Sequence, residues 1–150
     1  MAHLEVVHVA GYDPQINSLF VPAIVVARGR LVFVSGVTGA PVYHDHPHRP
    51  EVFDSIPHDA ASQARLAYGH LAQALTAAGC APADVVSLTR FFTHIAEDQD
   101  AVNAIQGEFF GGHLPTSTTV EVTRLATDPR LRLELQAIAV APDESGGSAA

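Results

Sequence analysis

The chain has 150 residues, of which 47% are hydrophobic and 16% are charged. This composition supports one folded domain with its own core and excludes a disordered chain. All eight basic residues are arginine, which excludes Schiff-base and P-loop lysine chemistry, and the net charge of −8 has the wrong sign for holding a nucleic-acid backbone.

The first third of the chain contains three short β-like runs, at 4–9, 23–27 and 31–37. The polar interruption Arg28-Gly29-Arg30 separates the second run from the third, so these two runs are predicted to form a hairpin. The segment 38–57 is rich in proline and histidine, and we expect it to be a long loop.

A helix is predicted to begin after Asp59, which can cap it, and to run to about Ala78. Gly79 stands where a glycine ends a helix. The residues expected on the buried stripe of this helix are Leu66, His70, Leu71, Ala74 and Leu75. The remaining elements are expected to be a strand at 84–93, a helix at 99–110 and two strands at 117–125 and 131–140.

The last two strands alternate between apolar and polar residues. In the final strand Arg132, Glu134 and Gln136 oppose Leu133, Leu135 and Ala137, and in the strand before it Ser117, Thr119, Glu121 and Thr123 oppose Thr118, Val120 and Val122. Because side chains alternate with a period of two, each strand is expected to turn its apolar face to the helices and its polar face away from them.

The element order βββαβαββ indicates an α+β fold, with two helices on one face of a mixed sheet. A single domain is expected over residues 1–142, with a disordered tail over 143–150. A polar sheet face on so weakly charged a chain predicts a subunit interface or a pocket, and we expect an oligomer.

Cys80 is the single cysteine, so an internal disulfide and a multi-cysteine metal site are excluded, and we expect Cys80 to be a packed residue. The first residues lack the pattern of a signal peptide, and no apolar run approaches the length of about 20 residues that a membrane span needs. A cytoplasmic protein without membrane or nucleic-acid partners is therefore expected.

Four stretches resemble the RidA/YjgF family of reactive intermediate deaminases: LVFVSG, QARLAYGHLAQALTAAGCAPADVVSLTRFF, AVNAIQGEFFGGHLPTSTTVEV and LELQAIAV. They cover about Leu31 to Val140 in the order of the family. The resemblance implies a chorismate-mutase-like (YjgF-like) fold and a homotrimer with three pockets at its subunit interfaces. It also implies hydrolysis of imines and enamines, such as 2-aminoacrylate, without a metal or cofactor.

The chain departs from that family at the residues that bind the substrate carboxylate. Deaminating members have an arginine two residues after the proline of PARSTVEV-like stretches, and Ser117 stands at this position here. A serine hydroxyl cannot replace the charged, bidentate grip of arginine on a carboxylate. The family's pocket tyrosine is also missing from the stretch Phe20-Val21-Pro22-Ala23, and Gln136 replaces a second glutamate.

Two other family positions, Glu134 and Asn103, are kept, and three further residues join them in the candidate site. Glu134 matches the family glutamate that organises water, and it could act as a general base or orient a water molecule. The alternative is a structural role, in which Glu134 forms a cross-strand pair with Arg132 or a neighbour. Asn103 matches an asparagine near the pocket. Ser117 and Thr119 are candidate hydrogen-bonding groups for a ligand, or simply strand formers. Gly36 is a candidate backbone N–H donor to a ligand, or a strand-end glycine.

Two further features stay open in the sequence. Arg90 lies in an apolar strand and is a candidate replacement anchor, but its parity with Leu88 and Phe92 favours a structural role on the helix side. Three alternating histidines, at 44, 46 and 48, suit zinc, nickel or copper. Because a proline-rich loop is poorly preorganised and no cysteine joins it, we expect no functional metal and place this loop at the pocket rim.

Two functions are compatible with these residues. One is a diverged, cofactor-free enzyme that hydrolyses or tautomerises a small imine, enamine or related metabolite, with little activity on 2-aminoacrylate. The other is a non-catalytic trimer that binds a metabolite or a partner protein in the same clefts. The retained Glu134 and Asn103 favour the enzyme, whereas the lost arginine and tyrosine favour the binding protein.

Overall fold

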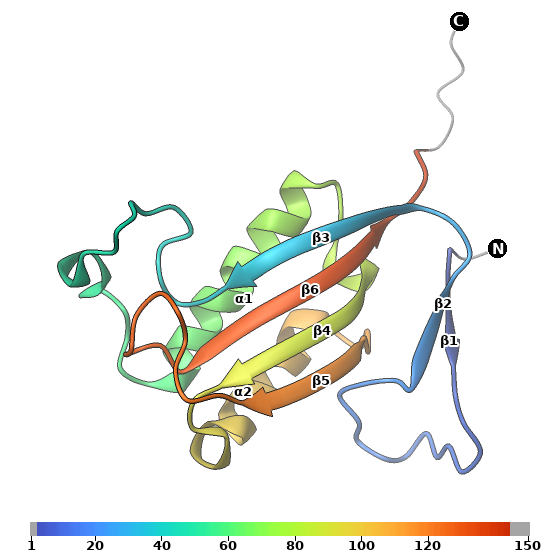
Figure 1. Cartoon of the computed structure of the whole chain (residues 1–150). Coiled ribbons are helices and arrows are strands. Elements are labelled where there is room, and N and C mark those ends of the chain that lie inside the picture. Colours follow the sequence, from blue (N-terminus) through green and yellow to red (C-terminus); the bar gives the residue numbers. More distant parts are fainter. Residues whose placement is uncertain (1–2, 145–150) are drawn as a thin grey trace, which may run out of the picture.

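The structure is a computed structural model that describes residues 3–144 (Figure 1). Within this range the elements follow the predicted order βββαβαββ. The strands are β1 Leu4–Val7, β2 Ala23–Val26, β3 Arg30–Val37, β4 Val85–Phe92, β5 Thr116–Glu121 and β6 Leu133–Ala141. The helices are α1 Ala60–Ala77 and α2 Ile95–Phe110, with short 3-10 turns at Pro50–Phe53 and Pro82–Asp84.

Four strands form a mixed sheet in the order β3-β6-β4-β5, and both α-helices cover one of its faces (Figure 1). β4 and β5 are parallel, whereas β6 is antiparallel to both β3 and β4. The last strand of the chain is therefore central. This arrangement confirms the predicted α+β fold with two helices on one face. We call the two faces of the sheet the helix face and the outer face.

The predicted hairpin between the second and third strands is wrong. β2 pairs with β1 in a separate two-stranded ribbon, and β3 pairs with β6 instead. Gly29, between β2 and β3, has φ of +119°, and an added Cβ would lie 2.6 Å from the carbonyl oxygen of Ala141. The chain at Gly29 thus packs against the end of β6 rather than forming a tight turn between two paired strands.

Helix α1 begins and ends where the sequence predicts. The Asp59 side chain accepts a hydrogen bond from the Ser62 backbone N–H at 2.8 Å. The buried stripe includes Leu71 and Leu75, as expected, but Leu66 is 40% exposed. The buried side of α1 also includes Ala64 and Ala67, and the helix packs against β6 and β3.

Helix α2 begins at Ile95, four residues before the predicted start. Its N-cap residue, His94, makes no side-chain capping bond. The Ile95 N–H instead donates to the Glu121 carboxylate at 2.9 Å, and Glu121 is the last residue of β5. A distant carboxylate therefore satisfies a free N–H of the first turn, where negative charge is also favourable.

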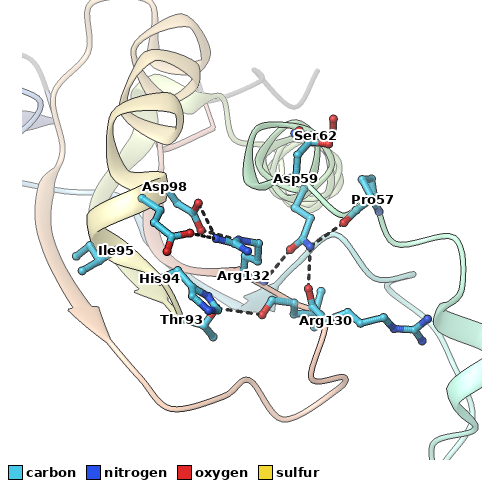
Figure 2. A network of polar contacts seen from close by, with 12 residues as sticks. Pro57, Asp59, Ser62, Thr93, His94, Ile95, Asp98, Arg130 and Arg132 are labelled. Carbon is cyan, nitrogen blue, oxygen red and sulfur yellow. Dashed lines mark hydrogen bonds and ion pairs between the residues drawn. The ribbon is translucent and has the colours of Figure 1, made fainter.

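A polar network joins α1, α2 and the start of β6 on the helix side (Figure 2). The fully buried Gln63 donates to the carbonyl oxygens of Pro57 and Arg130, at 2.8 and 2.9 Å, and accepts from the Arg132 N–H at 2.7 Å. The Arg132 guanidinium pairs with Asp98 at 2.8 Å. These bonds hold the entry to β6 in one position and direct the Arg132 side chain toward α2.

The segment after β6 has no regular structure as far as it is described. The carboxylates of Asp143 and Glu144 lie 3.9 and 3.3 Å from the guanidinium groups of Arg28 and Arg30. The predicted disorder of the tail falls mainly on residues 145–150, which lie outside the described residues. Over residues 3–144, none of the helices has the length and apolar character of a membrane span.

Candidate functional site

A cleft of about 720 Å³ runs along β3, between α1 and the segment that follows the strand. Its polar lining comes from three parts of the fold: Ser35, Gly36 and Thr38 at the end of β3, His70 and Gln73 on α1, and Glu134 on β6. His44 also lines it. We call this space the cleft.

A β-bulge brings two of the predicted site residues, Gly36 and Glu134, together. Val34 pairs with Ala137 and Val37 with Leu135, so β3 carries one more residue than β6 over this stretch. An added Cβ on Gly36 would lie 2.7 Å from Oε1 of Glu134. The absence of a Cβ at Gly36 therefore leaves room for the carboxylate in this position, and any larger residue would displace it.

The Glu134 carboxylate is half-buried and has no hydrogen-bond or ion-pair partner among the described residues. Burial raises the pKa of Glu134 above its ordinary value. The cross-strand pair with Arg132 is ruled out, because that guanidinium bonds to Asp98 and Glu97 instead (Figure 2). An unpaired, partly desolvated carboxylate at a cleft is suited to accept a proton from water or substrate.

His70 is a cleft residue that the sequence analysis assigned to the buried stripe of α1. Its Nδ1 lies 2.8 Å from the carbonyl oxygen of Thr38, and because a carbonyl only accepts, Nδ1 carries the proton. The other ring nitrogen, Nε2, therefore has a free lone pair in the neutral imidazole. The sequence signal that could have identified His70 as a cleft residue was its position, as a histidine, on an otherwise apolar stripe of the helix.

The structure does not bring Ser117 and Thr119 to the Glu134 side of the sheet. Ser117 is level with Leu88, and Thr119 is level with Arg90, which is also paired with the buried Leu135. These residues therefore point to the helix face, and Glu134, paired with Phe91, points to the outer face. The expected common polar face is wrong for β5, whose outward residues include Val120.

Thr119 instead contacts a buried arginine. The Arg90 side chain is 5% exposed and donates from Nε to the Thr119 hydroxyl at 2.9 Å. One of its terminal nitrogens donates to Asn103 at 2.7 Å and to Gln106 at 3.1 Å. We call Arg90, Asn103, Gln106 and Thr119 the Arg90 cluster.

No carboxylate among residues 3–144 forms an ion pair with Arg90. Burial lowers the pKa of its guanidinium, and a cation–π contact with Phe92, at 5.3 Å from the ring centroid, adds to the neutral hydrogen bonds that hold it. This confirms the helix-side position predicted from parity. Because its Nε and one terminal nitrogen donate hydrogen bonds to Thr119 and Asn103, Arg90 fixes the orientation of these two side chains.

Among the described residues, the three alternating histidines form a group that could hold a metal ion. The candidate ligand atoms of His44, His46 and His48 all lie within 4.8 Å of one another. His44 lies at the boundary between the cleft and this loop. The predicted place of the loop at the pocket rim agrees with this geometry.

Comparison with known proteins decides the family. Over 115 residues the chain is 34% identical to TdcF of Escherichia coli, which covers 75% of this chain and 80% of that protein. The profile of the family described as Endoribonuclease L-PSP matches residues 13–141. The chain belongs to the Rid/YjgF family.

Other Rid/YjgF proteins agree in sequence and in fold. The 2-iminobutanoate/2-iminopropanoate deaminase of Rattus norvegicus is 32% identical over 111 residues, which are 74% of this chain and 73% of that protein. YyfB, a Rid protein of Yersinia pestis, superposes with a TM-score of 0.77 over 93% of this chain and 99% of its own, at 24% identity. That second likeness concerns the fold alone.

Proposed function

We propose that this Rid/YjgF chain is an enzyme that hydrolyses or tautomerises a small imine or enamine. Its relatives include a protein named as an iminobutanoate and iminopropanoate deaminase. The observation that carries the proposal is the half-buried Glu134 carboxylate, which lacks a partner among the described residues and lies against Gly36 at the cleft. A carboxylate in that setting is available to orient a water molecule.

The proposed hydrolysis uses water and protein groups. Glu134 accepts a proton as the water oxygen forms a bond to the imine carbon, and the electron pair of the C=N bond moves to nitrogen. The proton then passes from Glu134 to nitrogen, which gives a carbinolamine. Glu134 next moves the hydroxyl proton to nitrogen, and the C–N bond breaks with its electron pair on nitrogen, so that ammonia leaves as the carbonyl forms. The backbone N–H of Gly36 is proposed to hold a polar group of the substrate, as the sequence analysis expected.

The second half of the proposed site needs another copy of the chain. Glu134 lies on the outer face, whereas Ser117, Thr119 and Asn103 lie on the helix side, so one chain cannot present both sets to one small molecule. The outer face also carries exposed apolar residues, with Leu31 59% and Phe33 73% exposed. These features support a homotrimer with a site at each subunit interface.

Sedimentation measurements test the assembly. The wild type should sediment as a trimer, and Phe33→Asp should shift it toward the 15.8 kDa monomer. Leu66→Asp changes an exposed apolar residue on the outer side of α1 and should leave the assembly intact. A wild-type monomer would contradict both the trimer and the interface site.

The substrate is proposed to differ from the usual 2-aminoacrylate. Without an arginine at position 117, the site lacks a charge-assisted, bidentate contact worth about 2–4 kcal/mol, which is about 30- to 1,000-fold in rate. Arg90 does not replace it, because its guanidinium is buried in the Arg90 cluster.

An assay coupled to a serine or threonine dehydratase tests this point. The chain should release 2-keto acid from the enamine far more slowly than a deaminating relative measured in parallel. Equal acceleration would show that another group holds the carboxylate. Saturable binding of a 2-keto acid, with no turnover on any imine offered, would favour the alternative of a non-catalytic binding protein.

A further inference from the structure

We propose that His44, His46 and His48 form a binding site for a divalent transition metal ion, with zinc as the expected ion. This site is independent of the proposed reaction, which needs no metal. The proposal also departs from the expectation drawn from the sequence, where the proline-rich loop argued against a preorganised site. It is carried by the positions of the three rings, by two defined ring nitrogens and by the contacts that hold the loop.

The three imidazoles already lie together. Their ring centroids are 5.2 Å apart for His44 and His46, 4.9 Å for His44 and His48, and 4.4 Å for His46 and His48. Their ligand atoms lie within 4.8 Å of one another. A tetrahedral zinc site with Zn–N bonds of about 2.0–2.1 Å separates its nitrogens by about 3.3–3.4 Å. Small side-chain rotations therefore close the site.

His44 is oriented by a backbone group in the way that metal-binding histidines usually are. Its Nδ1 lies 2.9 Å from the carbonyl oxygen of Pro41 and, because a carbonyl only accepts, Nδ1 donates the proton. Nε2 is then the unprotonated nitrogen and the available ligand atom. A second hydrogen bond of this kind fixes both the tautomer and the direction of a metal-binding ring.

His48 has a nitrogen that lacks a partner within the described chain. Its Nε2 is buried and makes no hydrogen bond. Buried polar atoms are nearly always satisfied, because an unpaired one loses its hydrogen bonds to water without replacement. A metal ion bound to the Nε2 lone pair would supply the missing partner.

The loop is held by packing and by an arginine. The Phe53 ring is 1% exposed, and the rings of His44 and His48 stand edge-on to it, with centroids 5.1 and 5.5 Å away. Arg130 donates to the Pro50 carbonyl oxygen at 2.8 Å and to Asp54 at 2.9 Å. The 3-10 turn that carries Phe53 is therefore fixed to the segment before β6, and the Phe53 ring packs against two of the three imidazoles.

The donor set selects the metal. Three neutral imidazoles suit zinc, nickel and copper, whereas magnesium and calcium prefer oxygen ligands. Three protein ligands also leave a fourth tetrahedral position for water. His44 lines the cleft and also a neighbouring pocket formed by residues 42–52 of the histidine loop. The ion would therefore lie at the rim of the cleft.

Calorimetric titration of the untagged, full-length protein with Zn²⁺ tests the site, with Mg²⁺ as the control ion. The wild type should bind one Zn²⁺ per chain and should not bind Mg²⁺ at these histidines. His46→Ala should weaken Zn²⁺ binding by at least about 10-fold, since even the loss of an outer-sphere partner costs about 10- to 100-fold. His46 is exposed, so its replacement should leave the fold unchanged by circular dichroism.

A matched variant and a spectroscopic probe complete the test. His58→Ala removes an exposed histidine outside the cluster and should leave Zn²⁺ affinity unchanged. Co²⁺ bound by the wild type should show the strong visible absorption of tetrahedral coordination, and His44→Ala should abolish it. Zn²⁺ binding well below one equivalent, or equal affinity in His46→Ala and His58→Ala, would overturn the proposal.

Discussion

The Glu134 carboxylate and the Arg90 cluster lie on opposite faces of one sheet, and the protein surroundings of the two charged groups are opposite in kind. At the cleft, a partly buried carboxylate has no partner within the described residues, and its pKa is raised. In the Arg90 cluster a buried cation is held by neutral oxygens and an aromatic ring. The first arrangement leaves a group available for chemistry, whereas the second uses its group to hold neighbouring side chains.

The strongest test of this contrast is Glu134→Gln, which keeps the shape of the side chain and removes the proton acceptor. Turnover of the true substrate should fall by about 10²–10⁴-fold if Glu134 is the general base. Steady-state kinetics with ligand binding measured in parallel checks this. Gln136→Ala, on the same strand and face, should change turnover little. Equal losses in both variants would contradict a specific role for Glu134.

Gly36→Ala tests whether the bulge positions that carboxylate. The new Cβ would lie 2.7 Å from Oε1, so the half-exposed Glu134 side chain must move. A displacement of about 1 Å at a reacting group costs about 100-fold in rate. We expect a loss of that order with little change in melting temperature. Gly69→Ala on α1 meets no atom within 4 Å and is the matched control.

Arg90→Leu should act on stability first. It removes the arginine that donates to the oxygens of Asn103 and Thr119, at a cost of about 1–3 kcal/mol in the free energy of unfolding, whereas Gln106 still accepts from the Tyr68 hydroxyl at 2.9 Å. Urea denaturation measures this cost. Arg65→Leu removes an exposed arginine and should change stability by less than about 1 kcal/mol. A stable Arg90→Leu protein without activity would instead show that Arg90 acts in function, through Asn103 and Thr119 or on the substrate itself.

The smallest expected effect is the pH dependence of stability that Glu134 contributes. Because the pKa of Glu134 is raised in the folded state, its protonated form is favoured by folding. The contribution is complete below the ordinary pKa of 4.5 and is lost as the pH rises through the folded value. Glu134→Gln should therefore melt slightly above wild type at pH 7 and level with it below pH 4.5. A lower melting temperature at pH 7 would indicate a stabilising partner for the carboxylate.

Local sequence signals predicted the parts of the fold that local chemistry controls. Asp59 caps α1 as expected, and Leu133, Leu135 and Ala137 form the buried side of β6. The start of α2 was placed four residues late, because its first free N–H is satisfied by Glu121, which is distant in sequence. A cap supplied from another element leaves no trace in the helix's own residues.

The same limit applies to the candidate site. The resemblance to the family selected Glu134 and Asn103, the strand end selected Gly36, and the structure brings Glu134 and Gly36 close together. It places Ser117 and Thr119 on the other face, where the Thr119 hydroxyl accepts from the buried Arg90. Alternation in a strand specifies two faces, but not which of them meets the helices.

The sequence alone therefore determined the order of the elements, the α+β class and the family, because periodicity, caps and motifs are properties of short segments. Only the tertiary structure decided that β3 pairs with β6, that Arg132 turns away from Glu134, and that three histidines of a proline-rich loop meet against Phe53. These outcomes depend on contacts between residues far apart in the chain. Such contacts form only when the packing of the whole domain brings those residues together.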